Sequence, residues 1–370
     1  MPRPFQAPYP WVPALEAELL GEARPIWERL LDDLAGARRE ILFENYLWRE
    51  GRAAEAVLDA LETAAAQGAR VRVLLDAAGA WALSMRSRRR LESLGEFRRY
   101  HPMDLEGLLG RLRDRLLVRT HRRIVVVDGK ACWTGGLPVH DDWWWEHPLP
   151  HRELMVRMQG PIVAQFSDAF ERLWRDAETP PPTPLAPMPP PAARAVPHDR
   201  KRRHYLRSLL HALHACRERA WFATPYFAPP RRLLSAMKRA RRRGVEVRLL
   251  LAGPRRHDHP SVWRAGRRHY GDLLGEGVRI WEFQRGFEHA KAALFDDDAF
   301  VGTPNLDHLS FDSNHEIAAE VRGAGLPDAL ETWFHGEFAD SREITLAAWR
   351  ARPLHDRFLE RFFGVFDPAF

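Results

Sequence analysis

The stretch HAKAALFDDDAFVGTPN, residues 289–305, decides the fold. It places His289 two residues before Lys291, then Asp296, and closes on a Gly-Thr-Pro-Asn run that ends at Asn305. Residues i and i+2 of a strand share one face, so the His289 and Lys291 side chains are expected to point into the same cleft. The stretch therefore predicts a cationic site where a buried strand begins.

A second copy of this pattern stands in the first part of the chain, in HRRIVVVDGKACWTGGLP, residues 121–138. His121, Arg123 and Asp128 keep the spacing, and a Gly-Gly pair follows at 135–136. The copies differ at two points. Arg123 occupies the position of a lysine, and Pro138 occupies the position of an asparagine, which removes an amide donor.

The same order of elements surrounds each copy, which predicts an α/β protein of two similar halves that form a pseudo-dimer around one shared site. We expect a largely parallel sheet, because apolar strands alternate with helices. The expected strands are 41–48, 71–75 and 124–127, then 221–223, 245–251, 292–295 and 300–301, and the expected helices are 53–67 and 233–243. The run PPPTPLAPMPPP, residues 180–191, favours polyproline II. The predicted division is residues 1–179, a linker at 180–197, and residues 198–370.

Bulk composition narrows the class of protein. The 370 residues are 45% hydrophobic, which fits a chain with a sizeable core, and the net charge of +6 allows anionic partners. Cys132 and Cys216 are too few for a disulfide framework or a cysteine-rich zinc site, so a reducing compartment is the simplest expectation. The N-terminus has no secretory h-region, and no run of about 18 apolar residues predicts a spanning helix.

The pattern H-x-K-x4-D followed by G-[GST]-x-N resembles the phospholipase D superfamily, whose members build one active site from two such motifs. The resemblance runs from about residue 40 to 320 and is nearest to bacterial cardiolipin synthases of the type without N-terminal transmembrane helices. The strings that carry it are ILFENYLW, ALETAAAQGARVRVLLDAAGA, THRRIVVVDGKACWTGG, VRMQGPIVAQF, RRRGVEVRLLLAGP and GTPNLDHLSFDSNHE.

The resemblance implies a division of work between the two histidines. One of His121 and His289 attacks phosphorus and the other protonates the leaving oxygen. Family habit favours His121 as the nucleophile, but the residues themselves leave the choice open. Arg123 and Lys291 stabilise charge on the phosphoryl oxygens, and Asn305 donates an amide hydrogen bond to them. The scheme needs no metal and no cofactor.

Family members also carry a carboxylate downstream of each motif, to orient a histidine and stabilise its charged form. Glu153 and Glu316 stand in comparable apolar contexts and are the candidates here. The sequence leaves open which glutamate serves which histidine. Asp128 and Asp296 belong to the motif among its catalytic positions, although their placement after a strand suggests support of strand and turn.

The resemblance implies transfer of a phosphatidyl group from phosphatidylglycerol to a second headgroup hydroxyl through a phosphohistidine. A phosphodiesterase of the same fold, acting on phospholipid or nucleic acid, is the alternative. Fused halves weigh against a nuclease, so nucleic acid is not the expected partner. A membrane-binding protein with a decayed site is a third possibility, which the intact His289, Lys291 and Asn305 oppose. The acceptor and the oligomeric state stay open.

A lipid enzyme without a membrane span must dock at an interface, here expected on the cytoplasmic side of a bacterial inner membrane. Candidate contacts are the tryptophans at 143–145, the phenylalanine-rich segment 358–370 and the arginines at 86 and 88–90. For each there is an ordinary alternative: internal packing for the aromatic residues and a solvated helix face for the arginines. The loop His257-Asp258-His259 is expected to be polar, not a metal site.

Overall fold

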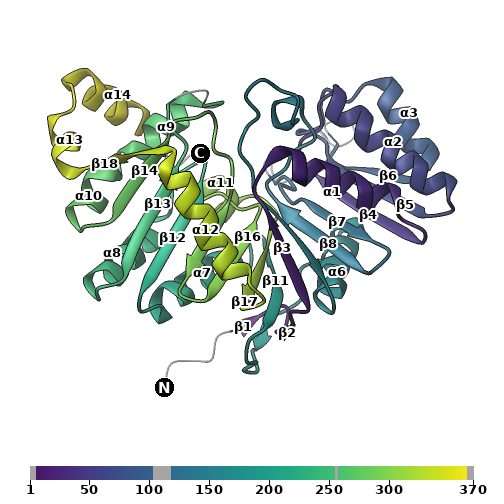
Figure 1. Ribbon diagram of the computed structural model, residues 1–370, viewed down its shortest axis with the longest axis horizontal. Coiled ribbons are helices and arrows are strands. Elements are labelled where there is room, and N and C mark those ends of the chain that lie inside the picture. The colour runs from purple at the N-terminus through teal and green to yellow at the C-terminus, as the bar shows by residue number, and fades with distance from the viewer. Residues whose placement is uncertain (1–5, 103–117, 255–256, 365–370) are drawn as a thin grey trace.

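Two α/β halves of similar build lie side by side in the computed structural model of the chain (Figure 1). The structure describes residues 6–102, 118–254 and 257–364. The first half, purple to blue in Figure 1, carries a seven-stranded sheet, and the second, green to yellow, carries a nine-stranded sheet. The predicted α/β class and the repeat of one half in the other are confirmed.

The first sheet has the strand order β3-β9-β8-β7-β4-β5-β6. Its elements, with the helices of this half, are β3 (Glu16–Leu20), α1 (Ala23–Ala35), β4 (Glu40–Asn45), α2 (Arg52–Ala66), β5 (Arg70–Asp76), α3 (Met85–Leu94), β6 (Gly95–Tyr100), β7 (Ile124–Val127), β8 (Ala131–Gly135), η1 (Asp141–Trp143), β9 (Met155–Gln159) and α6 (Ile162–Trp174).

The second sheet has the order β18-β14-β13-β12-β15-β16-β17-β11-β2. Its half consists of β2 (Val12–Pro13), β11 (Ala192–His198), α7 (His204–Ala215), β12 (Arg219–Thr224), α8 (Arg231–Arg242), β13 (Glu246–Leu251), α9 (Pro260–Arg267), α10 (Tyr270–Gly275), β14 (Arg279–Phe283), β15 (Ala292–Phe295), β16 (Asp298–Gly302), α11 (His308–Asp312), β17 (Glu316–Arg322), α12 (Leu326–Ala339), β18 (Ser341–Ile344), α13 (Leu346–Ala351) and α14 (Leu354–Gly364). A separate pair joins β1 (Gln6–Ala7) to β10 (Thr183–Pro184).

Both sheets are mixed, which corrects the expectation of a largely parallel sheet. Only the runs β4-β5-β6 and β12-β13-β14 pair in parallel, and the other pairs in the two sheets are antiparallel. The strands that follow the motifs, β7 and β15, are the antiparallel neighbours of β4 and β12. Antiparallel strands need only short turns, so β7-β8 and β15-β16 are hairpins between which no helix is required.

One hydrophobic core lies between the two sheets, and each half has an outer core of its own. Along β7, Ile124 and Val126 enter the shared core, while Val125 and Val127 enter the outer core of the first half. This alternation explains why every residue of the strand is apolar. Helices α6 and α12 complete the shared core, and α12 packs against β3 of the opposite half (Figure 1).

The predicted linker at 180–197 differs from the structure at its C-terminal end. Strand β11 pairs with β17 along its full length, so residues 192–197 belong to the second sheet. Strand β2, near the N-terminus, pairs with the other edge of β11. Along the chain, a strand of the second sheet, β2, thus comes before the first strand of the first sheet, β3. The boundaries of two separable domains stay a prediction.

Candidate active site

The two histidine motifs lie at the entrances of equivalent strands. His121 and Arg123 immediately precede β7, and His289 and Lys291 immediately precede β15. All four side chains are buried. The spacing in the sequence thus puts each cation beside its own histidine, as predicted.

Two short backbone bridges join the halves at these motifs. Thr120 pairs in parallel with His315, and the His121 N–H donates to the His315 carbonyl at 2.9 Å. Equivalently, Glu288 pairs with Arg152, and the His289 N–H donates to the Arg152 carbonyl at 3.0 Å. Each histidine is therefore held in register with the residue that follows the bridge in the other half.

Those following residues are the two predicted glutamates. Glu316 approaches His121 Nδ1 with both oxygens at 3.0 Å, and Glu153 Oε2 lies 2.5 Å from His289 Nδ1. Each carboxylate thus serves the histidine of the opposite half, which answers the question that the sequence left open. With Nδ1 occupied by a carboxylate, Nε2 is the nitrogen left for chemistry.

Arg123 fixes the protonation of His121. Its Nη1 lies 3.1 Å from His121 Nε2 and donates to the His121 carbonyl at 3.0 Å. Because a guanidinium has only donors, Nε2 must be the acceptor, and Nδ1 carries the hydrogen that Glu316 accepts. His121 is therefore a neutral imidazole with its lone pair on Nε2.

Lys291 holds the equivalent place in the second half. Its Nζ donates to the His289 carbonyl and lies 2.9 Å from His289 Nδ1. The Arg123 side chain makes the same kind of contact with its own histidine's carbonyl, so the substitution of Arg for Lys preserves a cation in place. The ring nitrogen contacted differs, because Arg123 lies against Nε2 of His121 whereas Lys291 lies against Nδ1 of His289.

Burial lowers the pKa of both histidines. The pKa of His121 is lowered by burial, against the opposing charge of Glu316, and Arg123 lowers it further. The pKa of His289 falls well below its ordinary value through burial and the charges of Lys291 and Arg123. Both imidazoles are thus neutral at pH 7, the form that can accept a proton or attack.

The two glutamates differ in pKa. Burial alone would raise the pKa of Glu316, but His121 and hydrogen bonds from Thr303 and Ser310 lower it below the ordinary value. The Thr303 hydroxyl donates at 2.5 Å and the Ser310 hydroxyl at 2.8 Å. Burial raises the pKa of Glu153 to about 7, even with Lys291 opposing it. Burial likewise lowers the pKa of Lys291 to about 7, with Glu153 opposing it.

The residue that follows the motif glycine, Gly136 in one half and Thr303 in the other, accounts for part of this difference. Thr303 stands where the first half has Gly136, so Glu153 receives no hydroxyl from this position. A Cβ at Gly136 would lie 2.4 Å from Glu153 Oε1, which excludes any side chain there without rearrangement. At this position Glu316 thus has a hydroxyl donor, Thr303, whereas Glu153 packs against the backbone of Gly136.

Comparisons with known proteins show the family to which the chain belongs. The family model described as "Cardiolipin synthase, PLD-like domain" matches residues 30–174 and 209–337. The chain belongs to this cardiolipin synthase family of phospholipase D-like proteins.

Curated relatives extend the match over nearly the whole chain. It is 30% identical over 379 residues to cardiolipin synthase A of Klebsiella pneumoniae (strain 342), which covers 95% of this chain and 75% of the relative. The match to cardiolipin synthase A of Cronobacter sakazakii is 30% over 376 residues with the same coverage. The structure of phosphatidylserine synthase from Haemophilus influenzae Rd KW20 shares the fold, with a TM-score of 0.75, 13% identity, and coverage of 96% of this chain and 94% of that one. The protein is thus an enzyme of the cardiolipin synthase family.

The motif aspartates of this family member lie in turns at the far ends of β7 and β15. The Asp128 carboxylate accepts the backbone N–H groups of Arg38, Arg39 and Glu40. Asp296 accepts those of Arg217, Glu218 and Arg219. These contacts tie the motif strands to the starts of β4 and β12. They favour the structural role and not the catalytic one that motif membership implies.

The departure at Pro138 leaves the two halves of the site unlike. Asn305 donates its backbone N–H to Ser310 Oγ at 3.0 Å, and its Oδ1 is buried without a hydrogen-bond partner among the described residues. Ser310 in turn donates to Glu316, so Asn305 is one residue removed from the His121 pair. In the first half the Asn45 amide donates to the Leu137 carbonyl, next to Pro138.

Three aromatic residues at the site were not predicted. Tyr46 meets His121 edge-on at 5.0 Å between ring centroids, and Tyr226 meets His289 at 6.3 Å. Each tyrosine stands just beyond the first parallel strand of its half, a repeat visible in FENYLW and ATPYFAP. Trp143 packs on His289 at 5.1 Å.

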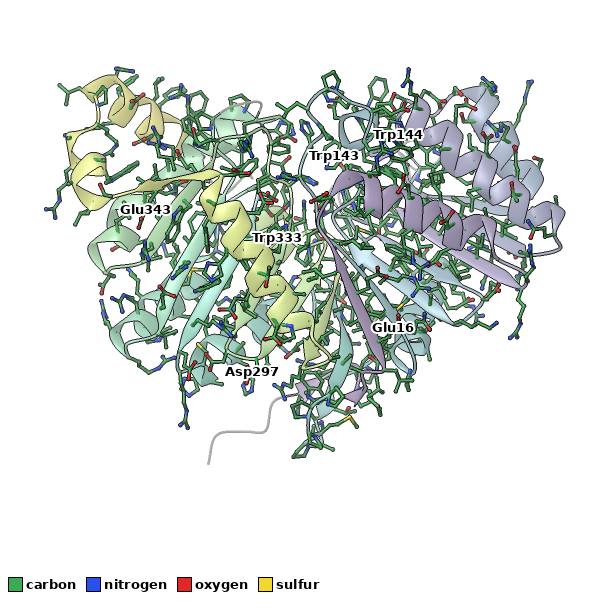
Figure 2. The ribbon with its side chains drawn as sticks, in the orientation of Figure 1. Glu16, Trp143, Trp144, Asp297, Trp333 and Glu343 are labelled. Carbon is green, nitrogen blue, oxygen red and sulfur yellow. The ribbon has the colours of Figure 1, made fainter. Side chains whose placement is uncertain are left out.

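Of the two possibilities left open for the tryptophans at 143–145, membrane contact and internal packing, the structure shows internal packing for the first two. Trp143 and Trp144 are only 6% and 7% exposed, and Trp27 donates its indole N–H to the Trp143 carbonyl. Figure 2 labels both beside the junction of the halves. The turn η1 folds them inward, so they support the site instead of contacting lipid.

The His257-Asp258-His259 loop is polar, as expected. Asp258 accepts the Tyr226 hydroxyl, and across residues 6–102, 118–254 and 257–364 no group of three His, Cys, Asp or Glu side chains is arranged to hold a metal ion. Over the same ranges, no helix has both the length and the apolar character needed to cross a bilayer.

Proposed function

We propose that the chain is a phosphatidyltransferase that moves a phosphatidyl group from phosphatidylglycerol to a hydroxyl of a second phospholipid headgroup. The observation that carries this is the pair of cross-half His–Glu contacts, His121 with Glu316 and His289 with Glu153. Membership of the cardiolipin synthase family supports the choice of lipid. The acid–base pair and the cations beside it support phosphodiester chemistry.

The first step uses the two histidines in opposite roles. His121 Nε2 attacks phosphorus, a P–N bond forms, and the P–O bond to glycerol breaks. His289, neutral in the free protein, takes up a proton when the anionic phosphodiester binds beside it and gives that proton to the departing glycerol oxygen. We assign attack to His121 because its Nδ1–H is fixed on Glu316, whose pKa is lowered, so the developing imidazolium faces an ionised carboxylate.

The second step reverses the roles. His289, now neutral, takes the proton from the hydroxyl of the second phospholipid as that oxygen attacks phosphorus. A new P–O bond forms and the P–N bond breaks, which restores His121. Arg123 and Lys291 supply positive charge to the phosphoryl oxygens in both steps, in a buried site where such charge acts strongly. One phosphodiester replaces another, so no nucleotide is consumed.

The test follows both products at once. Purified protein is incubated with phosphatidylglycerol vesicles, and cardiolipin and glycerol are measured together. The proposal expects equal amounts of the two. Phosphatidic acid with glycerol but no cardiolipin would replace the transferase by a hydrolase of the same site. His121→Ala and His289→Ala are each expected to abolish turnover, and full activity in either would refute the two-histidine scheme.

A further inference from the structure

The last helix, α14, exposes an apolar stripe to solvent, while its other apolar residues, Leu359 and Phe363, are half-buried. Its inward contact is a carboxylate: Glu360 is buried and accepts from Arg267 of α9 and from Arg352, each at 2.9 Å. Surface helices normally turn their apolar stripe to the protein. In α14 a buried carboxylate accompanies the half-buried apolar residues, and the outer face carries a further apolar stripe.

That outer face is apolar. Leu354, Phe358 and Phe362 recur every four residues and are all exposed, Leu354 by 78% and Phe358 by 69%. At 3.6 residues per turn they form one stripe, on the side of the helix away from Glu360. Phe358 and Phe362 stack on each other at 6.5 Å. Phe366 and Phe370, also in the predicted interfacial segment, lie outside the described residues.

Arginines border this stripe. Arg357, on the same helix, and Arg350, on α13, are exposed and line a surface hollow of about 490 Å³ together with Arg352 and Trp349. Exposed phenylalanine and leucine next to exposed arginine is the composition that suits the boundary between acyl chains and anionic headgroups.

A second patch of the same composition stands on the first half. Trp81 and Met85 are exposed at the start of α3, where Arg86, Arg88 and Arg89 are exposed too. Arg90 is turned toward α2, where it pairs with Glu55, Asp59 and Glu62. The exposed Arg86 and Arg88 pair with Glu55 and Glu92, but exposed ion pairs are weak, so these arginines and Arg89 can still meet anionic headgroups.

Both patches flank the candidate active site. Trp81 follows β5, whose last residue, Asp76, accepts the Thr120 N–H beside His121 at 3.0 Å. On the other half, α14 packs on α9, the helix that follows the carboxyl end of β13. Figure 1 shows α3 and α14 on one side of the molecule, on either side of the junction between the halves.

We propose that α13 and α14, together with the start of α3 at Trp81–Met85, form a face that docks the enzyme on an anionic phospholipid bilayer. The apolar side chains enter the interface, and the arginines contact anionic headgroups. The site between the two patches then faces the membrane from which its substrates come. The choice of a lipid partner rests on the proposed function, but the surface itself is read from exposure and charge.

The test measures vesicle binding without turnover. Full-length protein is sedimented with vesicles of phosphatidylcholine alone or mixed with phosphatidylglycerol. We expect tighter binding to the mixed vesicles, weakened by salt. Phe358→Ser with Phe362→Ser is expected to lower the partition constant at least tenfold. Leu15→Ser is the matched control, because Leu15 is 69% exposed beside β3 at the end opposite the site, and it should bind as the parent does.

A second measurement separates this proposal from the proposed function. Turnover of a short-chain phosphatidylglycerol dissolved as monomers needs no docking, so the double variant should keep the parental rate. If the parent turns over no substrate but binds vesicles, and the double variant does not bind them, the docking face stands and the proposed function fails. Unchanged vesicle binding in the double variant, or an equal loss in Leu15→Ser, would overturn the docking face. The docking face would also be overturned if the parent self-associates and the double variant loses that self-association but still binds vesicles.

Discussion

Glu316 of the second half holds Nδ1 of His121 of the first half through both carboxylate oxygens, each at 3.0 Å. The contact is set by the backbone, because the residue before each partner takes part in the Thr120–His315 bridge. Glu153 and His289 repeat the arrangement across the same junction.

Removing the charge of Glu316 should therefore impair chemistry at His121. Glu316→Gln is expected to lower kcat by about 100- to 10,000-fold, because the imidazolium that forms during proton transfer loses its counter-charge. Glu153→Gln should cost less at pH 7, since burial already raises the pKa of Glu153 to about 7. Initial rates on phosphatidylglycerol vesicles measure both. Equal rates in the parent and Glu316→Gln would contradict the assignment.

The plot of kcat against pH should decline on both sides of neutrality. The Glu153 carboxylate is lost as the pH falls through about 7, and the Lys291 ammonium is lost as the pH rises through about 7. A reaction that uses both charged forms has its highest kcat near pH 7. Lys291→Met should remove the alkaline limb and move the acidic limb to higher pH, because Lys291 lowers the pKa of Glu153. A kcat that does not change between pH 5 and 9 would contradict a requirement for the Glu153 carboxylate and the Lys291 ammonium.

The Thr303 hydroxyl should set the acidic limit of the His121 pair. It donates to Glu316 and helps to lower the pKa of that carboxyl. Thr303→Val, which has nearly the same shape, is expected to raise the pKa of Glu316, so the further loss of kcat that protonation of Glu316 adds below the Glu153 limb should begin at higher pH. Thr303→Ser keeps the hydroxyl and is the control. Identical profiles in the two variants would show that the hydroxyl has no such effect.

Arg123 should be replaceable by lysine but not by an uncharged residue. Lys291 shows that an ammonium can reach the motif histidine's carbonyl from this position. Arg123→Lys is therefore expected to stay within about tenfold of the parental kcat, losing only the contact with His121 Nε2. Arg123→Met should lose about 100-fold or more, because no cation remains for the phosphoryl oxygens on this side. Thermal melts confirm that both variants fold, and a fully active Arg123→Met would remove Arg123 from the reaction.

Asp128 and Asp296 should affect stability and leave the chemistry intact. Each accepts three backbone N–H groups at the start of a central strand. Asp128→Ala is expected to lower the free energy of unfolding by about 1–3 kcal/mol, with kcat per folded molecule unchanged. Urea unfolding and active-site titration separate the two quantities. A large fall in kcat at parental stability would restore a catalytic role.

Much of the site was predictable because its information is local. The two-residue spacing of His121 to Arg123 and of His289 to Lys291 places each cation beside its histidine, in the extended segment that precedes a strand. The repeat of this pattern predicts the second half. Glu153 and Glu316 were implied by the resemblance to the family, whose members carry a carboxylate downstream of each motif. Their crossed pairing was not, because it depends on Arg152 and His315 meeting backbone that is distant in sequence.

The other differences have physical causes as well. Buried strands such as β7 are apolar on both faces whether their neighbours are parallel or antiparallel, so composition could not reveal the mixed sheets. The tryptophans at 143–145 have the composition of a membrane contact, but the turn η1 and the indole of Trp27 draw two of them inside. Tyr46 and Tyr226 could have been noticed, since each follows the first parallel strand of its half.

The crossed pairing also has a consequence for synthesis. His121 and Glu316 are 195 residues apart, so at about 5–20 residues per second the ribosome needs roughly 10–40 s to make the second after the first. Throughout that interval His121 lacks its carboxylate, and for most of it Glu153 lacks His289, which is made 136 residues later. The growing chain can therefore lie beside a membrane rich in its own substrate and stay inert until translation is nearly complete.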